Sequence, residues 1–155
     1  FIMLLIAHFG WAKPVPINPF YFKNPRRDEA LVSLAGPLSN FIFALSFGLI
    51  IRFLLIPFFS SSSIVFLLFY FFFLFNVILG TFNLIPIPPL DGSKILFSLL
   101  PRQYRFYQMK LEYYGPYILF GIIFLDRMTR ADIVWGLIKY VLDFFTLLIT
   151  GMEGI

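Results

Sequence analysis

The 155-residue chain contains no cysteine, a single histidine and few charged side chains, which make up 13% of the sequence. Without cysteine the chain can form neither disulfides nor thiolate metal sites, and it has no cysteine nucleophile. No residue between Phe53 and Leu90 is charged. Soluble domains carry roughly 25% charged residues, and one of this size could not bury so long an apolar run. These absences predict an integral membrane protein.

The residues that are present support the same class. Hydrophobic side chains make up 60% of the chain, and phenylalanine alone contributes 23 residues. The net charge is +4, but the basic residues stand in short loops between apolar blocks, where they act as topology signals. We therefore expect a lipid bilayer as the partner of the chain, and no nucleic acid.

Apolar runs divide the chain into predicted helices. About 20 helical residues cross a hydrocarbon core, so Leu31–Phe58 and Ile64–Ile85 are long enough to span. Leu111–Leu125 and Ile133–Ile149 are shorter and predict short spans or interfacial or re-entrant elements. Phe1–Trp11 reads as the end of a segment that starts upstream. We expect an all-α, polytopic transmembrane helical bundle of about four spans plus this partial segment, forming one membrane-embedded domain, incomplete at its N-terminus, over residues 1–155.

Lysine and arginine concentrate in two loops, residues 13–27 and 94–110, whereas the serine turn Ser60–Ser63 has none. Cytoplasmic loops carry an excess of these residues. Both basic loops are therefore predicted to be cytoplasmic, which places Asp91 near the cytoplasmic side of the membrane. Lys13, Lys23, Arg26 and Arg27 could also contact anionic lipid, although topology alone accounts for them.

Small and polar residues recur at helical spacing in the two longest apolar runs. Residues three and four apart share one face of a helix, so each set predicts a face that packs against protein. The asparagine side chains in these sets could form hydrogen bonds between neighbouring helices, or they could contribute to a functional site. The members are Ser33, Gly36, Asn40, Ala44 and Gly48 in the first run, and Asn76, Gly80 and Asn83 in the second.

The segment FNLIPIPPLDGSKIL, residues 82–96, breaks the second run with Pro86, Pro88 and Pro89. Prolines remove backbone donors, so the helix should end just after Asn83. Broken backbone at membrane depth is tolerated only within protein or beside a wet cavity. An ionisable residue there, Asp91, is functional by default. The alternative is that Asp91 only caps a helix over Gly92–Leu100.

Two motifs resemble the site-2 protease family of intramembrane zinc metallopeptidases: LAGPLSN at residues 34–40 and FNLIPIPPLDGSKIL. The preceding FGWAKPVPINP, residues 9–19, is similar to the bacterial branch. The resemblance implies a zinc ion held by two histidines of an HExxH helix and by Asp91. It also implies that Asn83 acts at the active site on the substrate or the developing oxyanion, in the bacterial cytoplasmic membrane.

The implied activity is proteolysis of membrane-spanning or membrane-anchored proteins by zinc-activated water. Asn40 and the proline segment are then expected to face substrate. We expect Pro86, Pro88 and Pro89 to leave free backbone with which an unwound substrate pairs as an added strand.

The chain departs from the family pattern because it contains no HExxH. Its one histidine, His8, has no glutamate neighbour, and we do not assign it as a ligand. Both zinc-binding histidines are expected upstream of Phe1, so residues 1–155 alone should be inactive. Two alternatives are a pseudoprotease acting as a membrane scaffold and a transporter-like subunit with a polar path along Asn40, Asn76, Asn83 and Asp91.

Three further charged residues lie in apolar runs. Arg52 is expected to extend to the outer interface. Lys139 and Asp143 are one helical turn apart, which predicts a structural ion pair, with a proton relay as the alternative.

Overall fold

A computed structural model describes residues 24–60, 63–129 and 132–150, and these residues are almost entirely helical. The all-α prediction is confirmed for this part of the chain. His8, Phe1–Trp11 and the FGWAKPVPINP motif lie outside it. The elements are α2 (Pro25–Ile50), the π-helix η2 (Ile51–Leu55), α3 (Ile56–Phe58), α4 (Ile64–Asn83), α5 (Asp91–Leu99), the 3-10 helix η3 (Arg102–Tyr104), α6 (Arg105–Thr129), α7 (Ile133–Phe145) and the π-helix η4 (Thr146–Thr150).

The first long helix begins earlier than its apolar run. Pro25 occupies the first turn, where its missing N–H costs nothing, and Asp28 accepts a hydrogen bond of 3.1 Å from the Asn24 backbone N–H. These polar residues start the helix six residues before Leu31, because caps and not hydropathy set a helix boundary.

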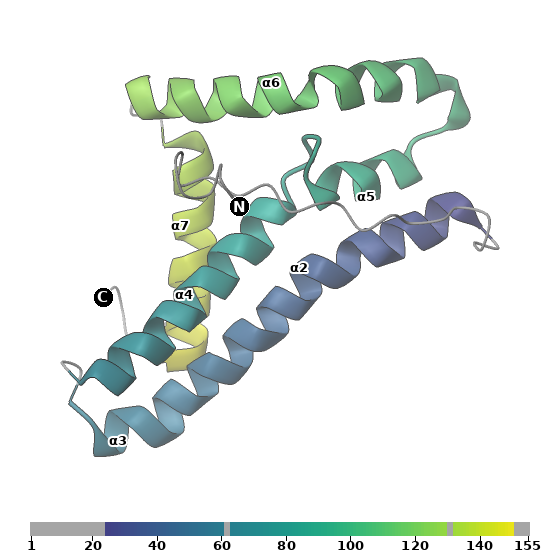
Figure 1. Ribbon diagram of the computed structural model, residues 1–155. Helices are drawn as coiled ribbons and strands as arrows, with labels where there is room; N and C mark the ends of the chain where they lie inside the picture. The colour runs from purple at the N-terminus through teal and green to yellow at the C-terminus, as the bar shows by residue number, and fades with distance from the viewer. Residues whose placement is uncertain (1–23, 61–62, 130–131, 151–155) are drawn as a thin grey trace, which may run out of the picture.

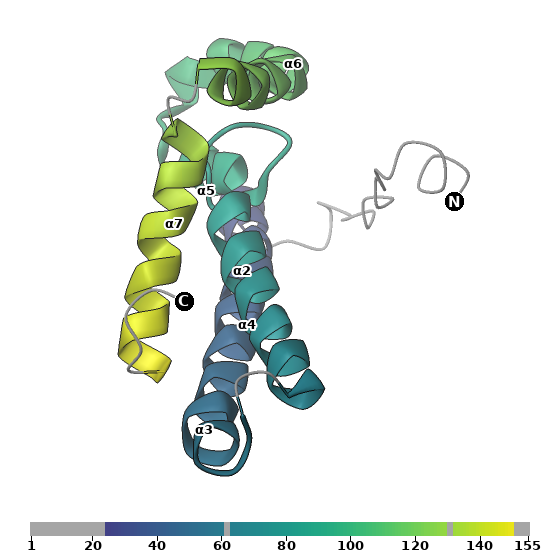
Figure 2. The same ribbon diagram turned by 90° about the vertical axis from the view of Figure 1, so that its left-hand side faces the viewer.

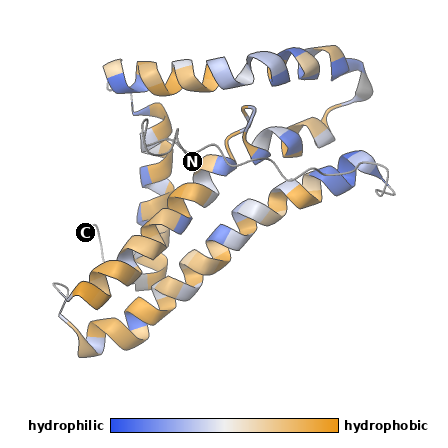
Figure 3. Ribbon diagram, viewed as in Figure 1, coloured by the Kyte–Doolittle hydropathy of each residue, from blue (hydrophilic) through white to orange (hydrophobic). Residues whose placement is uncertain are grey.

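Two helices are long and apolar enough to cross a membrane by length and composition: Pro25–Phe58, which joins α2, η2 and α3, and α4. Both helices are apolar along most of their length, while polar residues gather at the N-terminal end of α2 (Figure 3). Neither α6 nor α7 meets the same criterion. The prediction of about four spans is therefore supported for two.

The helices form an open bundle in which α6 lies across one end. Helices α2 and α4 run side by side, α7 packs beside α4, and α6 crosses near the end that holds α5 and the start of α2 (Figures 1 and 2). The far end holds α3. Five tyrosines are exposed at the α6 end: Tyr104, Tyr107, Tyr113, Tyr114 and Tyr117. Tyr104 belongs to η3 and the other four to α6, so this end of the molecule carries an exposed group of aromatic side chains.

Small residues allow the close helix contacts of the core. A side chain on Gly80 would meet the Phe41 ring at 3.0 Å, and one on Gly48 would meet Ile149. The Phe41 ring stacks on Phe145 with centroids 5.2 Å apart, which joins α2 to α7. The predicted packing face of α2 is confirmed at Ser33, Ala44 and Gly48, but Pro37, and not Gly36, completes its buried set.

The Asp126 side chain links α6 to α7 through hydrogen bonds. Its carboxylate is 3% exposed and accepts backbone hydrogen bonds from Ile133 at 2.7 Å, Val134 at 3.2 Å and Trp135 at 3.5 Å. The N-terminal N–H groups of a helix have no intrahelical acceptor, and a carboxylate satisfies both them and the helix dipole. A side chain from α6 therefore caps α7.

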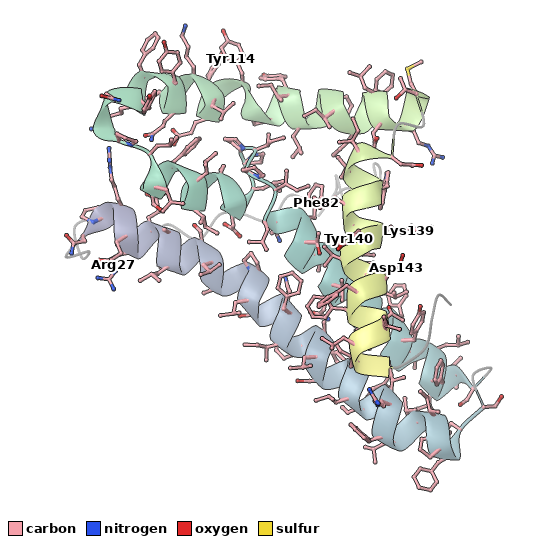
Figure 4. The ribbon with its side chains drawn as sticks, turned by 180° about the vertical axis from the view of Figure 1, so that it is seen from behind. Arg27, Phe82, Tyr114, Lys139, Tyr140 and Asp143 are labelled. Carbon is pink, nitrogen blue, oxygen red and sulfur yellow. The ribbon has the colours of Figure 1, made fainter. Side chains whose placement is uncertain are left out.

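One predicted charge interaction differs in the structure, and Arg52 has partners that the sequence did not predict. Among the described residues the one ion pair joins Lys94 to Asp91, so the predicted pair between Lys139 and Asp143 on α7 is wrong (Figure 4). Arg52 donates hydrogen bonds of 3.4 Å and 3.3 Å to the carbonyl oxygens of Leu148 and Ile149. The guanidinium thus joins η2 to the carbonyls of η4.

Candidate active site

The proline segment forms a compact turn between α4 and α5. Every backbone N–H that its seven residues possess already donates within the turn or to α4: Leu84 to Thr81 at 3.2 Å, Ile85 to Phe82 at 3.1 Å, Ile87 to Ile85 at 2.8 Å and Leu90 to Ile87 at 3.0 Å. The free backbone expected for a substrate strand is therefore limited to acceptors, because no N–H group of residues 84–90 is left unpaired. The three prolines lack an N–H altogether, so residues 84–90 can offer a substrate only carbonyl groups.

Two glycines, one on α5 and one on α6, lie directly against this turn. Gly92 of α5 lies directly against the Leu84 carbonyl, and a side chain on Gly115 of α6 would come within 2.6 Å of the Pro88 carbonyl oxygen. Pro88 itself is buried, and its peptide bond to Pro89 is cis. Sequence reasoning missed Gly115. The available signal was an isolated glycine inside an apolar helix, which often marks a close approach of backbone.

Asp91 is the first residue of α5 and does not cap it. The N-cap is Leu90, and no side chain caps the helix, so the capping alternative is wrong. The Asp91 side chain is 33% exposed, and its Oδ1 lies 3.9 Å from the Lys94 ammonium nitrogen. An ion pair this long and exposed contributes little. The carboxylate therefore remains accessible to another ligand.

Gly36 of α2 provides the surface against which this carboxylate rests. A Cβ atom at Gly36 would lie 3.3 Å from Asp91 Oδ2, tighter than ordinary contact. The two motifs, far apart in the sequence, thus lie against each other at this position.

The three asparagines of the two predicted packing faces have different surroundings. Asn76 donates a 2.8 Å hydrogen bond to the Phe72 carbonyl of its own helix, so its amide is occupied locally. Asn40 and Asn83 are half-buried, and within the described part of the chain neither side-chain amide has a hydrogen-bond partner. Asn40 follows Gly36 by one turn, about 6 Å along the helix. Asn83 follows the Phe41–Gly80 contact by less than one turn of α4.

A metal ion would find one ligand in this region. Catalytic zinc takes three protein ligands, commonly histidine nitrogen and carboxylate oxygen. Within residues 24–60, 63–129 and 132–150, no three histidine, cysteine, aspartate or glutamate side chains lie together. An accessible carboxylate on a rigid helix end fits the role of one such ligand, and the other two must come from elsewhere.

The fold and this site define a helical, membrane-associated protein with an accessible carboxylate beyond a proline break. Residues 59–125 match the model of peptidase family M50. YwhC of Bacillus subtilis, whose name describes a zinc metalloprotease, is 39% identical over 145 residues, which cover 89% of this chain and 64% of YwhC. Zinc metalloprotease MJ0392 of Methanocaldococcus jannaschii is 36% identical over 84 residues, 54% of this chain and 23% of its own.

These matches place the chain in the M50 peptidases, the site-2 protease family. The predicted family is therefore confirmed. The chain spans less than two thirds of the length of YwhC and less than a quarter of MJ0392. No solved structure matches the chain significantly.

Proposed function

We propose that this chain supplies the carboxylate ligand and part of the substrate site of an intramembrane zinc protease. The observation that carries the proposal is the Asp91 carboxylate, accessible at the start of α5 and set against Gly36 of α2. Two helices from the two family motifs thereby fix one oxygen ligand in place. The zinc metalloproteases named among the relatives support the choice of metal.

When bound, zinc supplies a Lewis acid that activates water for attack on a peptide carbonyl. Asp91 holds the metal through its carboxylate, and Lys94 neutralises part of the charge while the ligand is free. The other two ligands are the histidines of an HExxH helix, expected upstream of Phe1. Residues 1–155 alone therefore neither bind zinc tightly nor hydrolyse peptides.

Asn83 and Asn40 bind substrate in this proposal. Both amides are half-buried without a partner in the described chain, and an amide N–H can stabilise the negative charge that develops on a carbonyl oxygen. Asn83 directly precedes the proline segment, so it takes the catalytic role, and Asn40 orients the substrate. Pro86, Pro88 and Pro89 contribute acceptors to a substrate that supplies its own N–H donors.

The substrates in this proposal are membrane-spanning or membrane-anchored proteins, cut near the cytoplasmic side of a bacterial cytoplasmic membrane. Arg26, Lys94 and Arg105 line one groove at the end that holds Asp91, whereas Arg52 lies near the opposite end in η2. The excess of basic residues at the Asp91 end supports this orientation. The exposed apolar side chains along α2 and α4 face lipid or a substrate helix.

The test is zinc-dependent cleavage by the full-length protein in proteoliposomes with a membrane-anchored reporter. We expect a chelator to abolish cleavage and zinc to restore it. A full-length protein without bound zinc, stably folded and cleaving nothing, would favour the scaffold alternative. Zinc-independent flux of a solute across the vesicle would favour the transporter alternative.

A further inference from the structure

A groove of about 540 Å³ lies between the first turns of α2 and the outer side of α5. Arg26 and Arg27 line it at the N-terminal end of α2, where Figure 4 shows Arg27. Apolar side chains line the rest: Leu31, Leu34, Ile95 and Leu99. The groove therefore has a cationic end and an apolar end.

The cationic end has no opposing carboxylate. Within the described residues, Arg27 has no hydrogen-bond or ion-pair partner, and Arg26 donates only a 3.4 Å hydrogen bond to the Leu100 carbonyl. The nearest acid in the sequence, Asp28, binds the Asn24 backbone N–H and does not line the groove.

A neighbouring groove of about 530 Å³ differs in the charged residues that line it. It shares Arg26 and adds Lys94 and Arg105, but it also contains the carboxylates of Glu29 and Glu112. The lining of this groove therefore combines cations with carboxylates, whereas the 540 Å³ groove, which Arg26 also borders, is lined by two arginines and no carboxylate. An anion is better accommodated in the 540 Å³ groove.

We propose that this groove binds one anionic phospholipid, with its phosphate on Arg26 and Arg27 and an acyl chain along the apolar end. Guanidinium groups bind phosphate through paired hydrogen bonds. The apolar end is open, since Leu31 is 53% and Leu99 77% exposed. A free phosphate would leave these side chains uncovered, whereas a lipid covers both ends of the groove.

A lipid bound there bridges α2 and α5. The same two helices hold the contact between Gly36 and Asp91, so the lipid steadies the position of the proposed metal ligand. Lipid binding in this groove does not depend on the proposed protease activity, so either proposal can be wrong while the other holds.

The test is native mass spectrometry of the delipidated full-length protein, titrated with phosphatidylglycerol or phosphatidylcholine. We expect one phosphatidylglycerol to bind at least about tenfold more tightly than phosphatidylcholine, and the R26Q/R27Q variant to lose this preference. The matched control K110Q/R127Q also removes two positive charges, but neither residue lines the groove. It should bind phosphatidylglycerol like the wild type.

A second variant keeps the test decisive if R26Q/R27Q does not fold. Leu31→Trp keeps both arginines and fills the apolar end, and we expect it to weaken phosphatidylglycerol binding as well. Equal loss in R26Q/R27Q and K110Q/R127Q, or equal binding of the two lipids, would overturn the proposal. Displacement of phosphatidylglycerol by millimolar inorganic phosphate would show that phosphate alone is the ligand and would also overturn it.

Discussion

Gly36 and Asp91 bring the two motifs of the chain into contact. The carboxylate Oδ2 lies 3.3 Å from the point where a Gly36 side chain would begin. Gly36 belongs to α2 and Asp91 to the start of α5, so the contact fixes the carboxylate relative to two helices. Gly36 lies inside a regular helix, so the glycine matters here for the space it leaves beside Asp91 and not for an unusual backbone angle.

Replacing Gly36 by Val should displace the carboxylate. The added methyl groups would occupy the space beside Asp91, and changes that misplace a metal ligand typically cost about 10- to 100-fold in metal affinity. We expect the full-length protein with Gly36→Val to bind zinc at least about tenfold more weakly, measured by competition with a chelator. Gly121→Val is the control, because nothing lies within 4 Å of a Cβ atom at Gly121. Equal affinities in the two variants would refute the positional role.

Gly115→Ala should destabilise the protein by separating α6 from the proline turn. The new methyl group would lie 2.6 Å from the Pro88 carbonyl oxygen, and overpacking of this kind costs about 1–3 kcal/mol. Thermal unfolding in detergent measures the effect. Gly136→Ala should be neutral or stabilising, because its nearest neighbour is the Asp132 Cβ at 3.8 Å and alanine favours helix. A Gly115→Ala protein as stable as Gly136→Ala would contradict this packing.

Asp126→Asn should loosen the junction between α6 and α7. The substitution keeps the size of the side chain but removes its charge and one acceptor from the three N–H groups that it binds, at a cost of about 1–2 kcal/mol. Hydrogen exchange of the first turn of α7 should accelerate. Asp132→Asn is the control, since Asp132 makes no cap bond and its φ of 50° suits asparagine. Unchanged exchange in Asp126→Asn would exclude the cap.

Two buried serines should respond oppositely to replacement by alanine. Ser33 Oγ is buried with no hydrogen-bond partner in the described structure, whereas Ser93 Oγ donates a 2.7 Å hydrogen bond to the Leu90 carbonyl. Ser33→Ala removes an unsatisfied polar group and should leave stability equal or higher. Ser93→Ala should lower the free energy of unfolding by about 1 kcal/mol. The reverse order in equilibrium unfolding would show that Ser33 has a partner and Ser93 does not need one.

The sequence predicted the helices better than their ends. Hydropathy located the helix containing Leu31–Phe58, but the polar first turn was assigned to a loop because it carries Arg26 and Arg27. Proline chemistry located the end of α4 at Asn83 correctly, because a missing N–H is a local property of the sequence.

The parts of the site that depend on tertiary contacts could not be predicted in the same way. Nothing in the sequence places Gly115 against Pro88, since that contact follows from how α6 crosses the bundle. The alternative that Asp91 caps the helix is wrong because the helix begins one residue earlier than expected. The free backbone expected of the proline segment is limited to carbonyl groups, because the turn satisfies its own N–H groups.

The zinc content of full-length protein carrying Asp91→Asn tests most directly whether Asp91 is a zinc ligand. The amide keeps the size of the side chain but loses the charge that favours the metal. We predict about one zinc per wild-type molecule, and loss of most of it in Asp91→Asn while the helical content stays unchanged. Full zinc occupancy in a folded Asp91→Asn protein would contradict the assignment.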